Sequence, residues 1–421
     1  MTEAFGQGDV IGNGNGRGNG SMAGPVNPHI RRTIAPPVMA ARRWLAETAL
    51  PAGKPLINLS QAAPALPPPR PLREALARAV VEKESVHLYG PVLGLPALRE
   101  ALAADISATY GGTVRADQVA ITAGCNEAFA AAIATLAAPG DNVILPVPWY
   151  FNHAMWLSQS GIAIRPLVAG PDLLPRPEDA ARLIDGRTRA IVLVTPNNPT
   201  GVAYPPDLLA AFAALAARHG LALVLDETYR DFRAAEGPPH ALFADPDWDE
   251  VVIHLYSFSK VFRLTGHRVG ALVCAPARLA EAEKFLDTVT ICPAPIGQEA
   301  ALWGLTHLKD WLAGERQETL ERAAVVRAAM EALPGWRLEG LGAYFAWMRP
   351  PFALRGEALA RRLLAETGLL LLPGEMFVPA APDPAAAPGQ GRLRLAYANA
   401  DAARLREAFG RLAAFGRGGE V

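Results

Sequence analysis

The sequence is poor in cysteine and in net charge, and it lacks any long apolar run. Its three cysteines, Cys125, Cys274 and Cys292, are scattered, so they indicate neither a disulfide framework nor a metal site and fit a reducing compartment. A net charge of -1 argues against electrostatic binding to nucleic acid or to an anionic membrane. No run approaches the roughly 18 apolar residues of a membrane helix. We therefore expect a cytoplasmic protein without a metal, nucleic-acid or membrane partner.

The composition is that of a globular protein with room for two domains. The chain has 421 residues, of which 51% are hydrophobic and 19% charged. The opening segment, Met1–Gly24, is rich in glycine and asparagine and has no apolar core segment. It is neither a signal peptide nor a folded element, and we expect it to be disordered.

Lysine is scarce, with five residues against 35 arginines, and Lys260 differs from the other four. It follows the apolar run Val251–Tyr256, which predicts a buried strand, and no carboxylate stands in the stretch Ser257–Gly270. A lysine just past a strand end suits a Schiff base with an anionic aldehyde cofactor. A solvated surface lysine is the alternative. The other four lie beside acidic residues or in a turn: Lys54, Lys83, Lys284 and Lys309.

The stretch Ser257–Gly270 resembles the cofactor-lysine motif of class I/II aminotransferases, which are fold-type I enzymes that use pyridoxal 5'-phosphate. The family pattern is roughly S-x-S-K-x-[FY]-x-x-x-G-x-R-[IV]-G, and the stretch meets it at every fixed position. The resemblance implies that Lys260 binds the cofactor covalently and shuttles a proton. It also implies that Ser257, Ser259 and Arg268 surround the cofactor phosphate, for which the forked guanidinium of arginine is suited.

A second phosphate contact is predicted where a short strand, Gln118–Thr122, leads through Gly124 into a helix. Such a turn binds phosphate because free N–H groups and the helix dipole point at the anion, although many similar turns use glycine for packing alone. The turn resembles the T-x-G phosphate site of the family. In that case Gly124, Cys125 and Asn126 contribute mainly backbone amides. We do not expect Cys125 to be a nucleophile, because no histidine base lies nearby in sequence.

Asp226 ends the apolar strand Leu221–Leu225, where a partly buried carboxylate needs a partner. A protonated pyridine nitrogen would be such a partner, and the ion pair would keep the ring able to accept electrons. The segment Thr195–Gly201 resembles the family signature N-P-x-N-P-T-G, with threonine where asparagine is commoner. The resemblance implies that Asn198 and Tyr229 donate hydrogen bonds to the phenolate oxygen of the cofactor.

Two aromatic positions complete the predicted cofactor site. Tyr150 falls where relatives place the residue that stacks on the pyridine ring, and Trp149 is the alternative by a slip of one residue. The stretch Tyr89–Arg99 resembles the family motif Y-x-x-x-x-G-x-x-x-L-R. In relatives this tyrosine reaches the cofactor phosphate of the partner subunit, so the resemblance implies a homodimer with composite active sites. A purely structural turn at Tyr89 is the alternative.

The substrate end of the site is predicted from weaker signals. Arg394 fits the family pattern R-[LI]-x-[FY], which clamps the substrate α-carboxylate, and Arg392 is the alternative on the same face of the strand. The loop that contains Ala62 resembles L-x-x-G-x-P, with alanine at the glycine position, where the backbone could donate to substrate; a plain linker is equally compatible. The segment Pro379–Gly391 is rich in proline, alanine and glycine, and we expect a mobile loop that acts as a lid.

These signals predict an α/β fold of the fold-type I class with a mainly parallel sheet flanked by helices. We expect a large cofactor-binding domain over residues 65–300 and a smaller α/β domain formed by residues 25–64 with 301–421. Towards the C-terminus, a helical region should run from Pro293 to Leu333 with breaks near Gly304 and Gly314. A strand should follow at Gly342–Trp347.

The predicted function is an aminotransferase that moves an amino group between an L-amino acid and a 2-oxo acid through a ping-pong cycle of pyridoxal and pyridoxamine phosphate. Its catalytic residues would be Lys260, Asp226 and Tyr229. Another pyridoxal phosphate reaction, such as β-elimination or oxidation, is the alternative, because the same site can serve several chemistries. A non-catalytic regulator is a further alternative, but Met1–Gly24 is too short and uncharged for a DNA-binding domain. The substrate is not identified, although no clear second arginine marks a dicarboxylate pocket.

Overall fold

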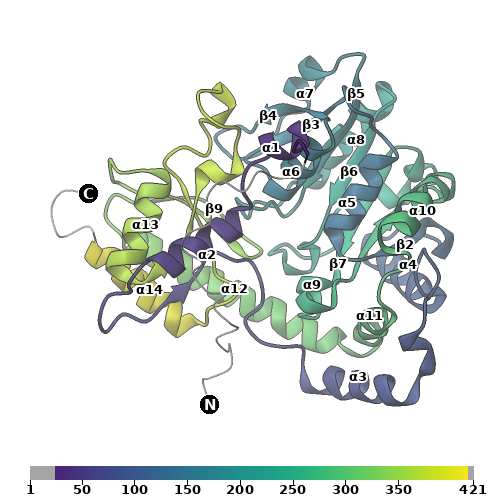
Figure 1. Ribbon diagram of the computed structural model, residues 1–421, viewed down its shortest axis with the longest axis horizontal. Helices are drawn as coiled ribbons and strands as arrows, with labels where there is room; N and C mark the ends of the chain where they lie inside the picture. Colours follow the sequence, from purple (N-terminus) through teal and green to yellow (C-terminus); the bar gives the residue numbers. More distant parts are fainter. Residues whose placement is uncertain (1–23, 416–421) are drawn as a thin grey trace.

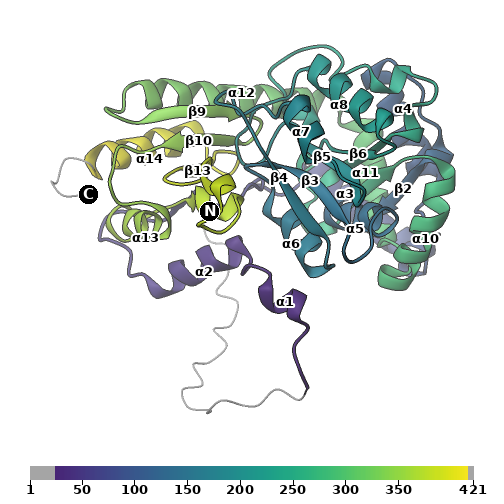
Figure 2. The same ribbon diagram turned by 90° about the horizontal axis from the view of Figure 1, so that it is seen from above.

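The computed structural model describes residues 24–415, so the tail predicted at residues 1–24 lies outside the described residues except for Gly24. The chain forms a larger body around a seven-stranded sheet and a smaller body beside it (Figures 1 and 2). The strand order in the large sheet is β2-β8-β7-β6-β5-β3-β4, and only β8 runs antiparallel to its neighbours. The predicted α/β class with a mainly parallel sheet is therefore confirmed.

The strands of the large sheet are apolar because helices cover both faces, as is usual in parallel sheets. Successive residues point to opposite faces, so Val143 and Leu145 of β3 belong to one core cluster and Ile144 belongs to another. The strands are β2 Val119–Thr122, β3 Asn142–Val147, β4 Ala163–Val168, β5 Thr188–Val194, β6 Ala222–Asp226, β7 Val252–Ser257 and β8 Gly270–Val273.

Two groups of helices bury the two faces of this sheet. One face packs against α5 Cys125–Ala134, α6 Phe151–Gln159 and α10 Pro276–Thr290. The other face packs against α4 Pro96–Tyr110, α7 Pro177–Leu183, α8 Pro206–Arg218 and α11 Pro295–His307, with α3 Arg70–Glu82 lying outside α11. The short helix α9 Phe258–Val261 follows β7 directly, and α1 Pro28–Arg32 packs on α6.

The smaller body is built on a sheet of order β12-β13-β10-β9. Strand β1 Ile57–Asn58, from the N-terminal part of the chain, pairs in parallel with β11 Leu369–Leu370 to form a separate two-stranded sheet in the smaller body. Helix α2 Pro37–Glu47 packs against the smaller body through Ala41 and Trp44. Its other elements are β9 Arg337–Gly342, β10 Phe345–Arg349, β12 Leu372–Pro373, β13 Leu393–Ala396, α13 Gly356–Thr367 and α14 Ala402–Phe415. The predicted domain boundaries at residues 65 and 300 stay a prediction.

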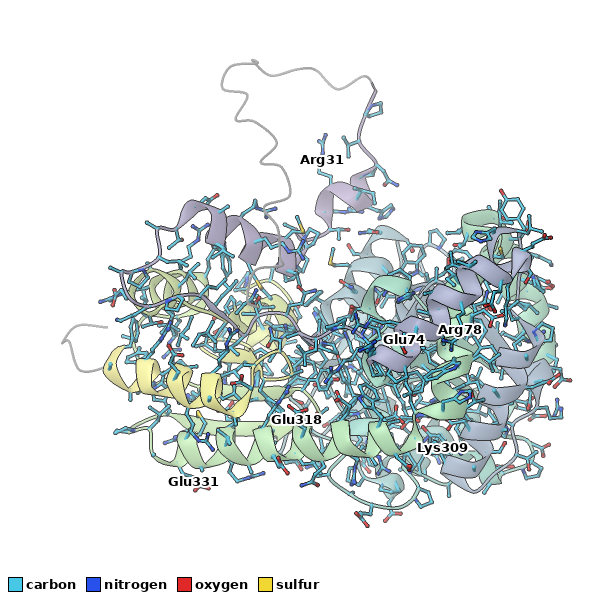
Figure 3. The ribbon with its side chains drawn as sticks, turned by 90° about the horizontal axis from the view of Figure 1, so that it is seen from below. Arg31, Glu74, Arg78, Lys309, Glu318 and Glu331 are labelled. Atoms are coloured by element: carbon cyan, nitrogen blue, oxygen red, sulfur yellow. The ribbon has the colours of Figure 1, made fainter. Side chains whose placement is uncertain are left out.

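Helix α12, Lys309–Glu331, links the two bodies. Figure 3 shows Lys309 at the end nearer the larger body and Glu331 at the opposite end, beneath the smaller one, with Glu318 between them. Its 23 residues span about 35 Å at 1.5 Å per residue. The helix contacts α11 and the turn after β6 in the larger body, and α14 and β9 in the smaller body.

The predicted breaks near Gly304 and Gly314 are wrong, because the helical region divides at Leu308 instead. Gly304 lies inside α11, where an added Cβ would come within 2.5 Å of the Phe262 ring, so the glycine serves close packing. Gly314 lies inside α12 next to open space. Glycine costs only about 0.5–1 kcal/mol in a helix, which tertiary contacts readily offset.

The predicted strand Gly342–Trp347 is also misplaced. Gly342 ends β9, a strand that the sequence analysis missed, and β10 begins at Phe345 after a turn through Ala343 and Tyr344. Two glycines interrupt the apolar pattern of β9, and each lies closest to a backbone carbonyl group of the Thr200–Gly201 segment. A Cβ on Gly340 would lie 2.5 Å from the Thr200 carbonyl oxygen, and one on Gly342 would overlap the Gly201 carbonyl oxygen. Glycine in a strand often marks such a close backbone approach.

We predict that Gly342→Ala lowers stability by about 1–3 kcal/mol, because the new methyl group would force the smaller sheet away from the turn before Gly201. Gly314→Ala is the matched control and should add about 0.5–1 kcal/mol, because its Cβ would meet open space within a helix. The midpoints of urea unfolding should therefore shift in opposite directions. Equal midpoints for the two variants would show that β9 does not pack closely on that turn.

Candidate active site

A pocket of about 280 Å³ lies at the carboxyl ends of β5, β6 and β7, where the two bodies meet. Parallel strands end at one edge of a sheet, which is the usual position of ligands in α/β folds. The structure brings most of the predicted site residues into the wall of this pocket. They are Ala62, Cys125, Asn126, Tyr150, Asn198, Asp226, Tyr229, Ser257, Ser259, Lys260, Arg268 and Arg394.

Lys260 projects from α9 directly after β7. The Ser257 hydroxyl caps this short helix by accepting a hydrogen bond from the Ser259 N–H, and the Lys260 Nζ donates to the Ala62 carbonyl oxygen at 2.7 Å. Burial lowers the pKa of Lys260 to about 8, and the nearby charges of Arg268 and Arg394 act in the same direction. About a tenth of the amine is therefore neutral at pH 7, far more than for an ordinary lysine, and the neutral form is the one that acts as a nucleophile or base.

The turn before α5 and the Arg268 guanidinium form a cradle of hydrogen-bond donors. Gly124 caps α5 with φ of 91°, and a Cβ there would overlap the Arg268 Nη2. Arg268 also donates to the Ser259 hydroxyl at 3.2 Å. The N–H groups of Cys125 and Asn126 lie in the first turn of α5, where no intrahelical acceptor exists. Charge and geometry therefore suit a phosphate group.

Asp226 lies at the floor of the pocket with 3% of its surface exposed. One carboxylate oxygen accepts from the Thr228 N–H at 3.0 Å, and the other lies 3.2 Å from the His153 Nε2. Burial by itself raises the pKa of Asp226, but the hydrogen bond and charge of His153 outweigh burial and hold the pKa below its ordinary value. The carboxylate is therefore ionised and can stabilise a cationic ring nitrogen.

Tyr150 lines the pocket, whereas Trp149 packs in the core of the large sheet. The Tyr150 hydroxyl accepts from the Asn152 Nδ2 at 3.0 Å. Burial, helped by the Asp226 charge, raises the pKa of Tyr150 to about 12, so its ring is neutral. The geometry thus favours Tyr150 over Trp149 as a surface for a flat ring.

Asn198 and Tyr229 approach the pocket from neighbouring strand ends. The Asn198 Oδ1 accepts from the Arg394 Nη1 at 2.9 Å, which leaves the amide Nδ2 to donate elsewhere. Tyr229 packs edge-on against Phe345, with ring centroids 5.1 Å apart. Burial raises the pKa of Tyr229 well above its ordinary value, so its hydroxyl is a hydrogen-bond donor at neutral pH.

Arg394 enters the pocket from β13 of the smaller body and is 2% exposed. Besides Asn198, its guanidinium contacts the Ser60 carbonyl oxygen, and it lies over the Phe377 ring at 4.8 Å. Burial lowers its pKa to about 10, so it stays cationic at neutral pH. Arg392 instead pairs with Glu339 at 3.0 Å, outside the pocket. Only Arg394 of the two therefore reaches the site in the structure.

Three predicted residues behave differently from the rest. The Ala62 backbone accepts from Lys260 through its carbonyl group, whereas the sequence analysis expected a donor there. Tyr89 is 80% exposed and does not line the pocket of its own chain. Gly124 shapes the phosphate cradle from behind Arg268 rather than lining the pocket.

Comparison with known proteins now identifies the family. The model of the family "aminotransferase class I and II" matches residues 54–412. The chain belongs to this family. The predicted transaminase activity is thereby confirmed in general terms, and members of the family use pyridoxal phosphate.

Similar proteins cover most of this aminotransferase. A probable aspartate/prephenate aminotransferase of Thermus aquaticus is 30% identical over 83% of this chain and 88% of its own. A valine–pyruvate aminotransferase of Mycobacterium tuberculosis is 31% identical over 76% and 83%. Among solved structures, the aspartate aminotransferase of Thermus thermophilus with maleate has a TM-score of 0.83 and 26% identity, covering 93% of this chain and all of its own.

The pocket of this aminotransferase fits pyridoxal phosphate on its own geometry. The cradle of Gly124, Cys125 and Arg268 suits the phosphate, and Asp226 lies where a pyridine nitrogen needs a carboxylate. Lys260 supplies the amine for the aldehyde, and Tyr150 offers a flat face for the ring. The cofactor would supply an electron sink when bound.

Sequence reasoning missed His153 as the partner of Asp226. The histidine projects from α6 and stacks on Phe129, with ring centroids 3.9 Å apart. Its position two residues after the aromatic run at residues 149–151 offered a signal, because a buried carboxylate at another strand end needs a donor. The pairing itself depends on the order of β3 and β6 in the sheet, which the sequence does not state.

We predict that Arg394→Ala raises the KM for the amino-acid substrate by about 10- to 100-fold, the cost of losing charged hydrogen bonds to a carboxylate. Cofactor should stay bound, because Arg394 is not part of the phosphate cradle at Gly124 and Arg268. Arg392→Ala is the matched control, since Arg392 is bound to Glu339 outside the pocket. A strong KM effect for Arg392→Ala, with none for Arg394→Ala, would contradict the geometry.

Proposed function

We propose that this aminotransferase uses pyridoxal 5'-phosphate held by the pocket residues described above and acts on amino acids with uncharged side chains. The observation that carries the cofactor assignment is the presence of the Lys260 amine, the Asp226 carboxylate and the phosphate cradle in one cavity. The proposed substrates are an L-amino acid and a 2-oxo acid, which take turns at the same site.

The proposed mechanism assigns each residue one task. Lys260 would hold the cofactor aldehyde, and its amine would remove the α-proton of the substrate and return it, for which a pKa of about 8 is suitable. Asp226 would stabilise a protonated ring nitrogen, and Asn198 and Tyr229 would donate to the ring hydroxyl oxygen. Arg394 holds the α-carboxylate, so the Cα–H bond stays oriented towards Lys260.

The preference for uncharged side chains follows from the charges that line the pocket. Among the described residues, its cations are Lys260, Arg268 and Arg394, and each has a task already. Asp226 is the one carboxylate in the wall, and it belongs to the ring nitrogen. The remaining wall includes Val38, Gln61, Ala62, Phe151 and Asn152, which carry no charge. A substrate side chain that is itself charged would lose hydration here without gaining a partner.

We further propose a homodimer in which Tyr89 reaches the phosphate site of the second copy. The support is an exposed apolar surface formed by Leu88, Tyr89, Val289 and Ile291, with exposed fractions of 65%, 80%, 60% and 44%. The segment around Tyr89 and the segment around Ile291 are joined by a hydrogen bond from the Gly90 N–H to the Cys292 sulfur at 3.3 Å. Exposed apolar patches of this kind are typical of protein interfaces.

A cytoplasmic location is also proposed, because Cys125, Cys274 and Cys292 are all free thiols in the structure. In residues 24–415, the structure contains no helix that is both long and apolar enough to cross a membrane.

The proposed chemistry predicts a single turnover when the enzyme receives an amino acid and no acceptor. The amino group stays on the cofactor, so the reaction should stop with one 2-oxo acid released per site and the cofactor as pyridoxamine phosphate. Leucine, methionine and phenylalanine should react with higher kcat/KM than aspartate or lysine. Absorbance follows the conversion of the cofactor, and product analysis measures the 2-oxo acid released from each amino acid. Continuous release of ammonia would instead indicate an elimination or an oxidation, and a strong preference for aspartate would contradict the charge argument.

The proposed dimer predicts complementation between two inactive variants. Tyr89→Phe removes the hydroxyl offered to the partner site, and Lys260→Ala removes the amine of its own site. A refolded mixture should contain heterodimers with one intact site each, so activity should return to a fraction of the wild-type value, while either variant alone stays weak. If purified heterodimers are no more active than the parents, Tyr89 acts within its own subunit or not at all.

A further inference from the structure

Glu227 is a buried carboxylate beside Asp226 that the proposed mechanism does not use. Its side chain is 1% exposed, and a single oxygen, Oε2, is approached by three side chains. It accepts hydrogen bonds from the Tyr110 hydroxyl and from the His240 Nε2 at 3.0 Å, and the His254 Nε2 lies 3.2 Å away. These side chains come from separate parts of the chain: α4, the loop before residue 242 and β7.

The network stabilises an ionised Glu227. Burial raises the pKa of this carboxyl, but His240 and His254 outweigh burial and hold the pKa far below its ordinary value. Burial also lowers the pKa of His254, so its ring is neutral at neutral pH. Tyr110 keeps its proton, because burial and then the Glu227 charge raise its pKa well above the ordinary value. Glu227 is therefore an ionised acceptor for the hydrogen bonds from Tyr110 and His240.

Glu227 and Asp226 lie on opposite sides of the same strand end, since consecutive residues of a strand point to opposite faces. Asp226 faces His153 of α6, and Glu227 faces Tyr110 of α4. The backbone of Glu227 is bound as well, because its N–H donates to the Leu255 carbonyl at 3.0 Å and its carbonyl accepts from the Arg230 N–H at 3.0 Å. The turn that carries Thr228 and Tyr229 lies between these anchors.

A buried ionic group by itself contributes little to the stability of a protein. Replacing a buried ionic network by apolar side chains is often neutral or stabilising, whereas a fully satisfied network restricts the position of its members. Here the restricted segment is the one that carries Asp226 and Tyr229. Its location therefore argues for a role in placing those two side chains.

We propose that Glu227, held by Tyr110, His240 and His254, is a positioning residue that fixes the end of β6, so that Asp226 and Tyr229 meet the cofactor ring in the correct geometry. This proposal rests on the proposed cofactor site. Loss of the Glu227 charge would leave a carboxamide that holds Tyr110 and the two histidines less strongly, and the strand end would move. A displacement near 1 Å at a catalytic group can reduce the rate by about 100-fold.

The test compares Glu227→Gln with Asp185→Asn. Asp185 is also an acid in a polar network, since it binds Asn142 at 2.8 Å, but that network lies at the amino ends of β3 and β5, away from the pocket. Both changes replace a carboxylate by its amide and should lower the melting temperature. Only Glu227→Gln should lower kcat, by about 10- to 100-fold, with the amino-acid KM within about twofold of wild type.

A second measurement does not depend on the reaction. Amide hydrogen exchange of the cofactor-free protein should accelerate at residues 226–230 in Glu227→Gln relative to Asp185→Asn, while the rest of the sheet exchanges alike in both. Pyridoxal phosphate should also bind more weakly to Glu227→Gln. If exchange at residues 226–230 and kcat per folded site both match Asp185→Asn, Glu227 is structural only and the proposal is wrong.

Tyr110→Phe covers the case in which Glu227→Gln does not fold. It removes one donor and keeps the ring, which packs against Phe243 with centroids 4.9 Å apart. We expect the same direction of change in kcat and in exchange at residues 226–230, with a smaller size. Wild-type values in both measurements would overturn the proposal. Failure of the wild type to release one 2-oxo acid per site would instead refute the proposed reaction, while the exchange result would still stand.

Discussion

An excess of positive charge in one buried pocket is the constraint on which the site depends. Lys260, Arg268 and Arg394 line the pocket, and Asp226 is the one carboxylate among the described residues of its wall. Burial and mutual repulsion bring the pKa of Lys260 to about 8, and burial brings that of Arg394 to about 10. A phosphate and a carboxylate would neutralise this charge, so the pocket favours an anionic cofactor together with an anionic substrate.

The fold holds Arg394 apart from bulk solvent and surrounds it with dipoles and rings instead of carboxylates. The Arg394 guanidinium contacts the carbonyl oxygens of Asn198 and Ser60 and lies over the Phe345 and Phe377 rings. Such contacts orient a guanidinium without cancelling its charge. A carboxylate partner would stabilise the empty site more strongly, but it would compete with the substrate. The absence of an acid beside Arg394 is therefore part of how the pocket binds anions.

Local sequence signals led to residues that lie together at one pocket, because each signal lies within one strand end and the turn that follows. The stretch around Lys260, the Gly124 turn and the Asp226 strand end meet there, since parallel strands bring their carboxyl ends to the same edge. The chemical roles of these residues stay predictions.

What could not be predicted depends on contacts between distant segments. His153 pairs with Asp226 across 73 positions of sequence, and Tyr110 contacts Glu227 across 117. The β9 strand was missed because its two glycines, Gly340 and Gly342, make room for the Thr200–Gly201 backbone, and their neighbours in sequence do not reveal that contact. The predicted helix breaks at Gly304 and Gly314 rested on helix propensity alone. Gly304 lies inside a helix instead, where the missing side chain allows close packing against Phe262.

The residues proposed for the chemistry and the uncharged residues of the pocket wall come from different parts of the fold. Lys260, Asp226 and Asn198 follow strands of the large sheet, where ladders of hydrogen bonds hold them rigidly. Val38 and Gln61 reach the same pocket from α2 and from the loop after β1, which belong to the smaller body's packing. A substitution at Val38 or Gln61 can therefore change the shape and polarity of the pocket without moving the catalytic groups. Proteins similar to this one carry names as different as aspartate/prephenate and valine–pyruvate aminotransferase, so membership of the family does not by itself determine the substrate.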